Sequence, residues 1–182
     1  MAQLTARAQA LPLGDPRQGP VVLGSVVDMH TVHRANALID DALAKGARLL
    51  CGSKASSTLM PATLLDHVTA DMDIFREETF APVKAIVRVR GVEQAIAVAN
   101  DNEFGLSSAV YGRDTARAWQ VAARLETGIC HINGPTVHDE AQMPFGGVKA
   151  SGYGRFGGQA GIDAFTDTRW ITMQTRERHY PF

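Results

Sequence analysis

The spacing of apolar residues predicts a helix in the first quarter of the chain. Residues 32–43 carry apolar side chains every three or four positions, which would form one face of a helix: Val32, Ala35, Leu38, Ile39, Ala42 and Leu43. Gly46 is suited to end this helix, because glycine adopts the left-handed C′ conformation without a Cβ clash. The Pro- and Gly-rich segment 11–27 is expected to be an ordered loop, and 48–51 a short strand.

The middle of the chain alternates between strand and helix patterns. These patterns follow in the order strand 83–90, helix 92–99, strand 106–111, helix 115–126 and strand 129–132. Asp114 is suited to cap the second helix, since its carboxylate can accept from free backbone N–H groups. The apolar face of that helix would be Ala118, Trp119, Ala122 and Leu125. Strands and helices at this spacing imply βαβ units, so the predicted fold class is α/β with a parallel sheet covered by helices.

The last third of the chain is rich in glycine. Residues 133–161 are expected to be mostly loop. Gly152–Gly157 matches the dinucleotide-binding fingerprint as text, but that fingerprint requires a preceding strand and a helix N-terminus at the pyrophosphate. With no strand predicted before Gly152, we interpret this stretch as loop. Residues 168–173 predict a final, detached strand, which would pair with another domain or subunit.

Composition and charge narrow the class of protein. The 182 residues are 45% hydrophobic and 20% charged, as in a soluble globular protein of one domain. A net charge of -1 gives no support for binding to nucleic acid or to an anionic membrane surface. No apolar run approaches the roughly 20 residues that span a bilayer, and residues 1–9 do not resemble a signal peptide.

Cysteine and histidine usage predicts neither a disulfide framework nor a metal site. With two cysteines, the sequence favours a reduced, cytoplasmic protein. His30, His33 and His67 lack the clustering of metal ligands, so no metal is expected.

Three segments in order resemble motifs of the NAD(P)-dependent aldehyde dehydrogenase superfamily. Residues 77–83 (EETFAPV) resemble its E-E-x-F-G-P-V motif, and residues 100–110 (NDNEFGLSSAV) its N-x-x-x-[YF]-G-L-x-x-x-V motif. Residues 128–155 resemble G-x-x-x-[IV]-N followed by P-F-G-G-x-K-x-S-G-x-G-R, and Gly14-Asp15-Pro16 resembles the family's G-D-P element. The similarity covers nearly the whole chain. The loop 133–144 is more similar to members that act on salicylaldehyde, vanillin and benzaldehyde.

The resemblance implies a position within a larger enzyme. Residues 1–165 would form the C-terminal portion of the catalytic domain, within the family's three-layer parallel-sheet fold. Residues 166–182 would form the oligomerisation strand and tail. The implied cofactor is NAD or NADP, and the implied substrate is a small aldehyde. The implied partner is a second copy of the chain or a complementary N-terminal chain.

Four residues match positions that bind cofactor or substrate in the family. Glu78 would hydrogen-bond the nicotinamide-side ribose, and Phe80 would pack near the nicotinamide. The alternatives are a surface carboxylate for Glu78 and core packing for Phe80. Ala81 replaces the motif's usual glycine, which could tighten the local turn. His138 and Phe145 would line the substrate pocket, although for residues 138–140 the residues themselves favour a solvated loop.

No residue of the chain matches the catalytic positions of the family. Its chemistry needs a cysteine nucleophile, a glutamate base and an asparagine that stabilises the oxyanion, all upstream of the G-D-P element. Cys51 ends an apolar strand, and Cys130 and His131 would point to opposite strand faces. The isolated chain is therefore expected to be inactive.

Two rival classes of function stay open at this stage. One is a non-catalytic assembly module, since exposed apolar surface favours association. The other is a hydrolase that uses Cys130. The natural aldehyde, the choice between NAD and NADP, the oligomeric state and the origin of the chain as a truncation or split product are not determined by the sequence.

Overall fold

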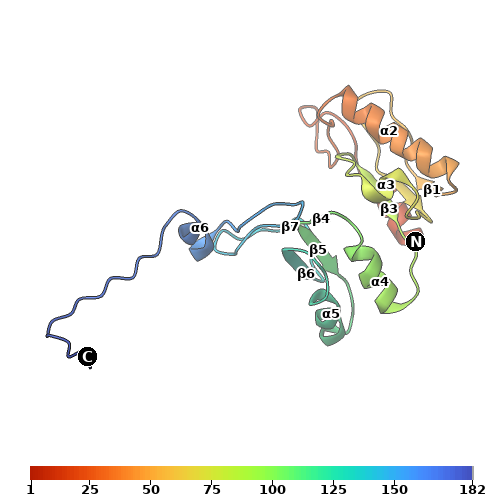
Figure 1. Cartoon of the computed structure of the whole chain (residues 1–182). Helices are drawn as coiled ribbons and strands as arrows, with labels where there is room; N and C mark the ends of the chain where they lie inside the picture. The colour runs from red at the N-terminus through yellow and green to blue at the C-terminus, as the bar shows by residue number, and fades with distance from the viewer. Residues whose placement is uncertain (182) are drawn as a thin grey trace. The chain divides into compact units, whose positions relative to one another are not determined.

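The computed structural model describes residues 1–181, which divide into two compact units (Figure 1). The first unit is Met1–Ala95 and the second begins at Ile96. Each unit combines short strands with helices, so the α/β class predicted from the sequence is confirmed. The expected division at residue 165 stays a prediction.

The first unit contains one three-stranded sheet and three helices. Its strands are β1 (Arg48–Cys51), β2 (Thr63–Asp66) and β3 (Val83–Ile86), in the order β1-β2-β3. β1 pairs with β2 in antiparallel register, and β2 pairs with β3 in parallel register. The helices are α1 (Ala2–Gln9), α2 (Met29–Ala44) and α3 (Asp73–Arg76).

Helix α2 follows the predicted pattern closely. Asp28 caps its start by accepting a hydrogen bond from the Thr31 backbone N–H at 2.8 Å. Gly46, just past its end, has a φ of 102°, the left-handed conformation that the sequence predicted. Of the predicted apolar face, Leu43 is 38% exposed, and the other five residues are buried.

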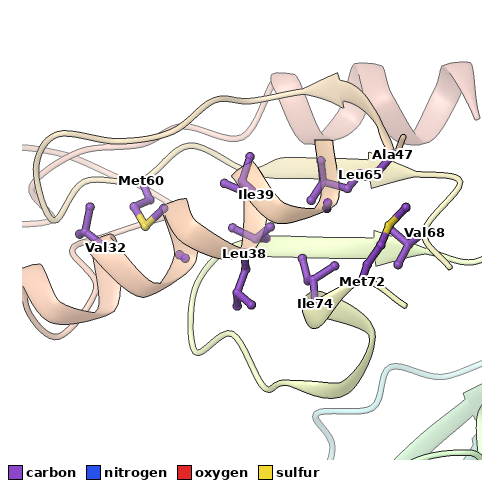
Figure 2. Close-up of a cluster of buried hydrophobic side chains, with 12 residues drawn as sticks. Val32, Leu38, Ile39, Ala47, Met60, Leu65, Val68, Met72 and Ile74 are labelled. Carbon is purple, nitrogen blue, oxygen red and sulfur yellow. The ribbon is translucent and has the colours of Figure 1, made fainter. Parts of the chain in front are cut away.

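The hydrophobic core of the first unit lies between α2, α3 and the sheet (Figure 2). Its largest buried side chains are Ile39, Met60, Leu65, Met72, Val32, Val68 and Val83. Each fully buried aliphatic side chain contributes roughly 1.5–3 kcal/mol relative to exposure to water. This core is what gives the first unit its stability.

The buried carboxylate of Asp66, at the end of β2, is paired with the guanidinium of Arg88, which follows the end of β3. Asp66 is 3% exposed, and it accepts two hydrogen bonds from Arg88, at 2.7 Å from Nε and 2.6 Å from Nη2. The Arg88 guanidinium is the main cause of the lowered pKa of Asp66, which falls from 3.8 to about 2. The pair is therefore charged over the whole physiological pH range.

The second unit is built from short strands around one βαβ motif. After α4 (Gly91–Asn100), which crosses the junction of the units, come β4 (Phe104–Gly105), β5 (Ser107–Val110), α5 (Thr115–Ala122), β6 (Ile129–Ile132), β7 (Val148–Lys149) and α6 (Gly158–Ala164). β5 and β6 are parallel and α5 connects them, as predicted. β4 pairs with β7 in antiparallel register.

Helix α5 begins where the sequence predicted and ends earlier. The Asp114 carboxylate accepts from the Arg117 backbone N–H at 3.0 Å, which confirms the predicted cap. The helix ends at Ala122, four residues before the predicted end at Glu126. Trp119, predicted on the buried face, is 69% exposed, whereas Ala118 is buried.

One expectation about the strands is wrong. The strand predicted over 83–90 ends at Ile86 and pairs with β2 rather than β5, so the described residues form three small sheets instead of one. β2 was not predicted from the sequence. All four of its residues are buried, so the strand does not show the alternation of buried and exposed positions that marks a half-buried strand. The described tail forms no strand at residues 168–173 by itself, since no neighbouring strand is present to share its hydrogen bonds (Figure 1). Pairing of this segment with another domain or subunit stays a prediction.

Within residues 1–181, no helix is long and apolar enough to cross a membrane. The same residues bring together no group of three or more side chains that could hold a metal ion.

Candidate functional site

A cavity of about 360 Å³ opens in the second unit, between β6 and the loop that follows it. Ile129, Met143, Pro144 and Phe145 supply apolar surface, and the remaining lining residues are Gly128, Cys130, His131, His138, Asp139 and Glu140. The volume lies in the usual range for a small-molecule site. The two residues predicted from the sequence to line a substrate pocket, His138 and Phe145, thus lie in one cavity.

Close backbone contacts hold the wall of this cavity. Phe145 and Phe156 exchange two backbone hydrogen bonds, of 2.8 and 2.7 Å, which fix the start of the glycine segment. Gly128 lies so close to the Gly146 carbonyl that a Cβ at position 128 would collide with it. The sequence needs glycine here because no side chain fits between the two backbones.

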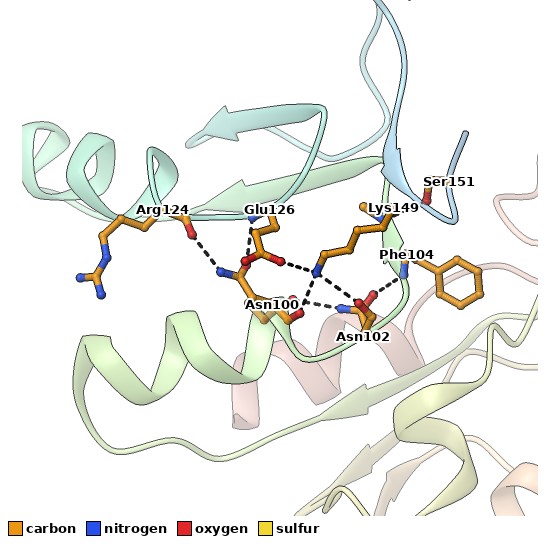
Figure 3. Close-up of polar contacts among 9 residues, drawn as sticks. Asn100, Asn102, Phe104, Arg124, Glu126, Lys149 and Ser151 are labelled. Atoms are coloured by element: carbon orange, nitrogen blue, oxygen red, sulfur yellow. Dashed lines mark hydrogen bonds and ion pairs between the residues drawn. The ribbon is translucent and has the colours of Figure 1, made fainter. Parts of the chain in front are cut away.

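A polar cluster around Lys149 anchors the other end of the same segment (Figure 3). The Lys149 ammonium contacts Glu126 Oε2 at 2.6 Å and donates to the Asn100 carbonyl at 2.7 Å and the Asn102 carbonyl at 3.2 Å. The Asn100 side chain accepts from the Glu126 N–H at 2.9 Å and donates to the Arg124 carbonyl at 2.9 Å. The cluster therefore ties the end of α4, the connection from α5 to β6, and β7 together.

The charged and imidazole side chains of the cavity are two histidines and two carboxylates. The His131 and His138 rings meet edge to face, with centroids 5.8 Å apart and planes at 82°. His138 Nε2 lies 3.5 Å from Glu140 Oε1, and both of these side chains are more than half exposed. His131 Nε2, in contrast, is buried and has no hydrogen-bond partner among residues 1–181.

A second hollow, of about 320 Å³, lies in the first unit at the start of α2. It is lined by Val27, His30, Thr31, Arg34, Thr79 and Phe80. Phe80 is 71% exposed and has a φ of 49°, a left-handed conformation that a bulky residue rarely adopts. Core packing, the alternative interpretation of Phe80, does not describe this residue. Strain of this kind concentrates at ligand sites.

The residues of this hollow fit part of a dinucleotide. The exposed Phe80 ring offers a face to a planar heterocycle. Arg34, which reaches Glu77 Oε2 at 3.2 Å, can donate hydrogen bonds to sugar or phosphate oxygens. The Thr79 hydroxyl donates to the Ala81 carbonyl at 3.4 Å, so its oxygen can accept from a sugar hydroxyl. Glu78, which lies between Glu77 and Thr79 in the sequence, is exposed, but it is not among the residues that line the hollow.

Neither cysteine is paired with a base. Both are free thiols. Cys51 is 5% exposed, and its sulfur lies 3.8 Å from the Ala62 carbonyl oxygen. Cys130 is half-buried in the wall of the cavity.

Sequence reasoning missed His131, Cys130 and Arg34 as lining residues. Alternation along a strand was expected to separate Cys130 from His131, yet both line the cavity. All four residues of β6 are half-buried, so this strand has no single buried face. One feature of the sequence could have indicated Cys130 and His131 as lining residues. Both lie in a parallel strand of a predicted βαβ unit, and ligands bind beside such strands.

Comparisons with known proteins agree on one family. The model of the Aldehyde dehydrogenase family matches residues 1–171. A vanillin dehydrogenase of Pseudomonas fluorescens is 56% identical over 181 residues, which cover 100% of this chain and 38% of that protein.

Solved structures give the same result. The crystal structure of a salicylaldehyde dehydrogenase from Pseudomonas putida G7, complexed with salicylaldehyde, matches with a TM-score of 0.94 and 47% identity, over 100% of this chain and 38% of that chain. An NADP-dependent glyceraldehyde-3-phosphate dehydrogenase from Bacillus halodurans C-125, complexed with NADP, matches with a TM-score of 0.86 and 36% identity, over 92% and 35%. The chain thus spans little more than a third of the length of these relatives. The family match over most of its residues shows that the chain belongs to the aldehyde dehydrogenase family.

Proposed function

We propose that the chain is the C-terminal portion of the catalytic domain of an NAD(P)-dependent enzyme that oxidises an aromatic aldehyde to its carboxylate. The observation that carries this proposal is the cavity beside β6. Its volume of about 360 Å³ and its mixture of Ile129, Met143 and Phe145 with two imidazoles suit a single substituted benzene ring. The names of the similar proteins, which act on vanillin and salicylaldehyde, support the same class of substrate.

The hollow at α2 is the proposed contact with the cofactor. Phe80 would pack against the nicotinamide ring, and Arg34 and Thr79 would hold neighbouring oxygens. Glu78 is proposed to accept from the ribose diol after a local turn of its exposed side chain. NAD or NADP, when bound, supplies the hydride acceptor. The residues of this hollow do not distinguish between the two.

The nucleophile is proposed to lie outside these 182 residues. Cys51 is buried against the Ala62 carbonyl. Within residues 1–181, no basic side chain forms a hydrogen bond with the sulfur of Cys130. Attack on an aldehyde needs an accessible thiolate, which an adjacent base or cation produces. We therefore expect no oxidation of aldehydes by the chain alone.

The C-terminal tail is proposed to form the oligomerisation strand when it meets a partner. Trp170, Ile171 and Met173 are 89%, 76% and 85% exposed, which is unusual for side chains of this size. A second copy of the chain, or a complementary N-terminal chain, would cover them. This exposure also favours the second candidate function, a non-catalytic assembly module. The two free thiols agree with a reducing, cytoplasmic location.

The test is formation of NADH or NADPH by the purified chain with salicylaldehyde, vanillin and benzaldehyde. We expect no turnover with either cofactor. We expect turnover once a complementary polypeptide that carries the family's nucleophile is added. Turnover by the chain alone that Cys130→Ala abolishes would contradict the proposal, because it would place the nucleophile in β6. If no complementary polypeptide restores activity but the chain self-associates, the assembly module is the better description.

A further inference from the structure

The cavity beside β6 contains an unusual buried nitrogen. His131 Nε2 has less than 1 Å² of exposed surface and no hydrogen-bond partner within residues 1–181. The other buried polar side chains are paired, as Asp66 is by Arg88 and Thr31 by Asp28. An unpaired buried polar atom costs about 1–3 kcal/mol. A buried atom of this kind in a native protein calls for an explanation, and a ligand that completes its hydrogen bonding is one.

The side chain that packs against the His131 ring, His138, is itself exposed. The His138 ring stands edge to face against the His131 ring, with centroids 5.8 Å apart. The His138 side chain is 56% exposed, and its 3.5 Å contact with Glu140 Oε1 is made on the same exposed loop. Exposed side chains change rotamer within nanoseconds. A turn of the exposed His138 side chain away from the His131 ring would open His131 to a molecule in the cavity.

We propose that His131 recognises a hydroxyl group on the aromatic ring of the substrate, and that His138 covers His131 when the cavity is empty. This inference rests on the proposed function, because it assigns a substituent to the aldehyde that the cavity takes. A neutral imidazole has one donor and one acceptor nitrogen. A phenolic hydroxyl both donates and accepts, so it can pair with Nε2 in either tautomer. A methyl ether can only accept, and an unsubstituted ring does neither.

The remaining polar residues of the cavity are poorer candidates for this role. Asp139 and Glu140 are exposed carboxylates, which water already solvates. Cys130 offers only a weak S–H donor. Among the polar residues of the cavity, His131 is the one whose hydrogen bonding changes most when a ligand hydroxyl binds.

The test compares two ligands that differ in one group. Vanillin (4-hydroxy-3-methoxybenzaldehyde) and 3,4-dimethoxybenzaldehyde are titrated into the whole chain, and the imidazole ¹⁵N resonances of the histidines are followed by NMR. Any reaction of the aldehyde with lysine or cysteine is common to both ligands. We expect vanillin to shift the His131 resonances and to bind about tenfold more tightly, a difference of 1.4 kcal/mol.

Two variants assign the preference to one residue. His131→Phe should lower the affinity for vanillin to that for the dimethoxy compound and leave the latter unchanged. His131→Gln, which keeps a donor and an acceptor, should retain part of the preference. His138→Ala removes the cover and should keep the preference in full.

The outcomes separate this inference from the proposed function. Equal affinities of the wild-type chain for the two ligands would overturn the inference and leave the cavity as an aldehyde site. Loss of the preference in His138→Ala but not in His131→Phe would overturn it as well. Binding of neither ligand in the cavity would count against the proposed function itself.

Discussion

The two units of the chain bury apolar side chains to very different extents. Fourteen of the sixteen buried hydrophobic residues lie in the first unit, and only Ile96 and Ala118 lie in the second. Both units expose large apolar side chains, but among residues 1–181 most of those that are more than half exposed lie in the second unit: Tyr111, Trp119, Val137, Met143, Tyr153, Phe156, Ile162, Phe165, Trp170, Ile171, Met173 and Tyr180. The first unit is thus stabilised by its own core. The second depends on backbone pairing, close glycine contacts and the Lys149 cluster.

This difference bears directly on function. The first unit, which has the larger core, contains the proposed cofactor hollow. The second unit, which has the smaller core, contains the proposed substrate cavity. Large exposed apolar surfaces are typical of regions that meet another domain or subunit. The relatives contain more than twice as many residues as the chain matches, so they include polypeptide that could cover such surfaces.

Truncation of core residues should give the largest contrast between the units. Leu65→Ala empties a fully buried position in the first unit and should lower the free energy of unfolding by about 2–5 kcal/mol. Trp119→Ala removes a larger side chain, but one that is 69% exposed, and should change the free energy by less than about 0.5 kcal/mol. Urea unfolding followed by circular dichroism measures both. Similar losses in the free energy of unfolding for both variants would mean that the core of the second unit contributes about as much stability as that of the first.

A glycine contact should be the weak point of the second unit. Gly128→Ala forces a Cβ against the Gly146 carbonyl and should destabilise by about 1–3 kcal/mol or more, with loss of ligand binding in the cavity. Gly134→Ala is the matched control, since its Cβ would meet only His131 Cβ at an ordinary 3.6 Å. Equal stabilities of the two variants would show that the segments can move apart.

The Asp66–Arg88 pair should make the first unit sensitive to acid. The folded pKa of Asp66, about 2, lies below the ordinary 3.8, so the pair stabilises the fold fully above about pH 5 and loses this effect as pH falls toward 2. Asp66→Asn should cost about 1–3 kcal/mol at pH 7, with a smaller difference near pH 2. Unfolding curves at several pH values check this. A difference independent of pH would show that charge is not its source.

The Lys149 cluster should have a smaller, local effect. Lys149→Met removes contacts to Glu126 and to two carbonyls, and should cost about 1 kcal/mol while hydrogen exchange rises in residues 134–147. Lys84→Met, on an exposed strand position of the first unit, serves as the control. Unchanged exchange near the cavity would mean that the cluster does not position its wall.

Phe80 should have a small effect on stability and a clearer effect on cofactor binding. Phe80→Gly relaxes a left-handed residue and removes an exposed ring, so the free energy of unfolding should change by less than about 1 kcal/mol. Binding of NAD or NADP should weaken, as isothermal titration would detect. A large loss of stability would instead assign Phe80 to packing.

Prediction from sequence succeeded where the signal was local. The face of α2, its stop at Gly46, the Asp114 cap and the unit of β5, α5 and β6 depend on neighbouring residues, and each was found. The pairing of β3 with β2 and the order of the sheets depend on contacts between distant segments, which periodicity does not encode. Trp119 was placed on a buried face because its spacing fits one, although no surface within the described residues covers it.

The same division holds for the sites. Family motifs located Glu78, Phe80 and Phe145, and the position of the loop located His138. Phe80, His138 and Phe145 line a cavity or hollow, whereas Glu78 does not. The role proposed for His131 was not predicted, because the burial of its Nε2 depends on three-dimensional packing that the sequence pattern does not show.

The most direct test of the account is to map where an aromatic aldehyde binds on the chain. Backbone amide shifts would be recorded while salicylaldehyde is added to the ¹⁵N-labelled protein. We expect the changes to be confined to residues 128–131 and 138–145, the two segments that line the cavity. Changes centred on other residues, or none at all, would contradict the assignment of this cavity to the substrate.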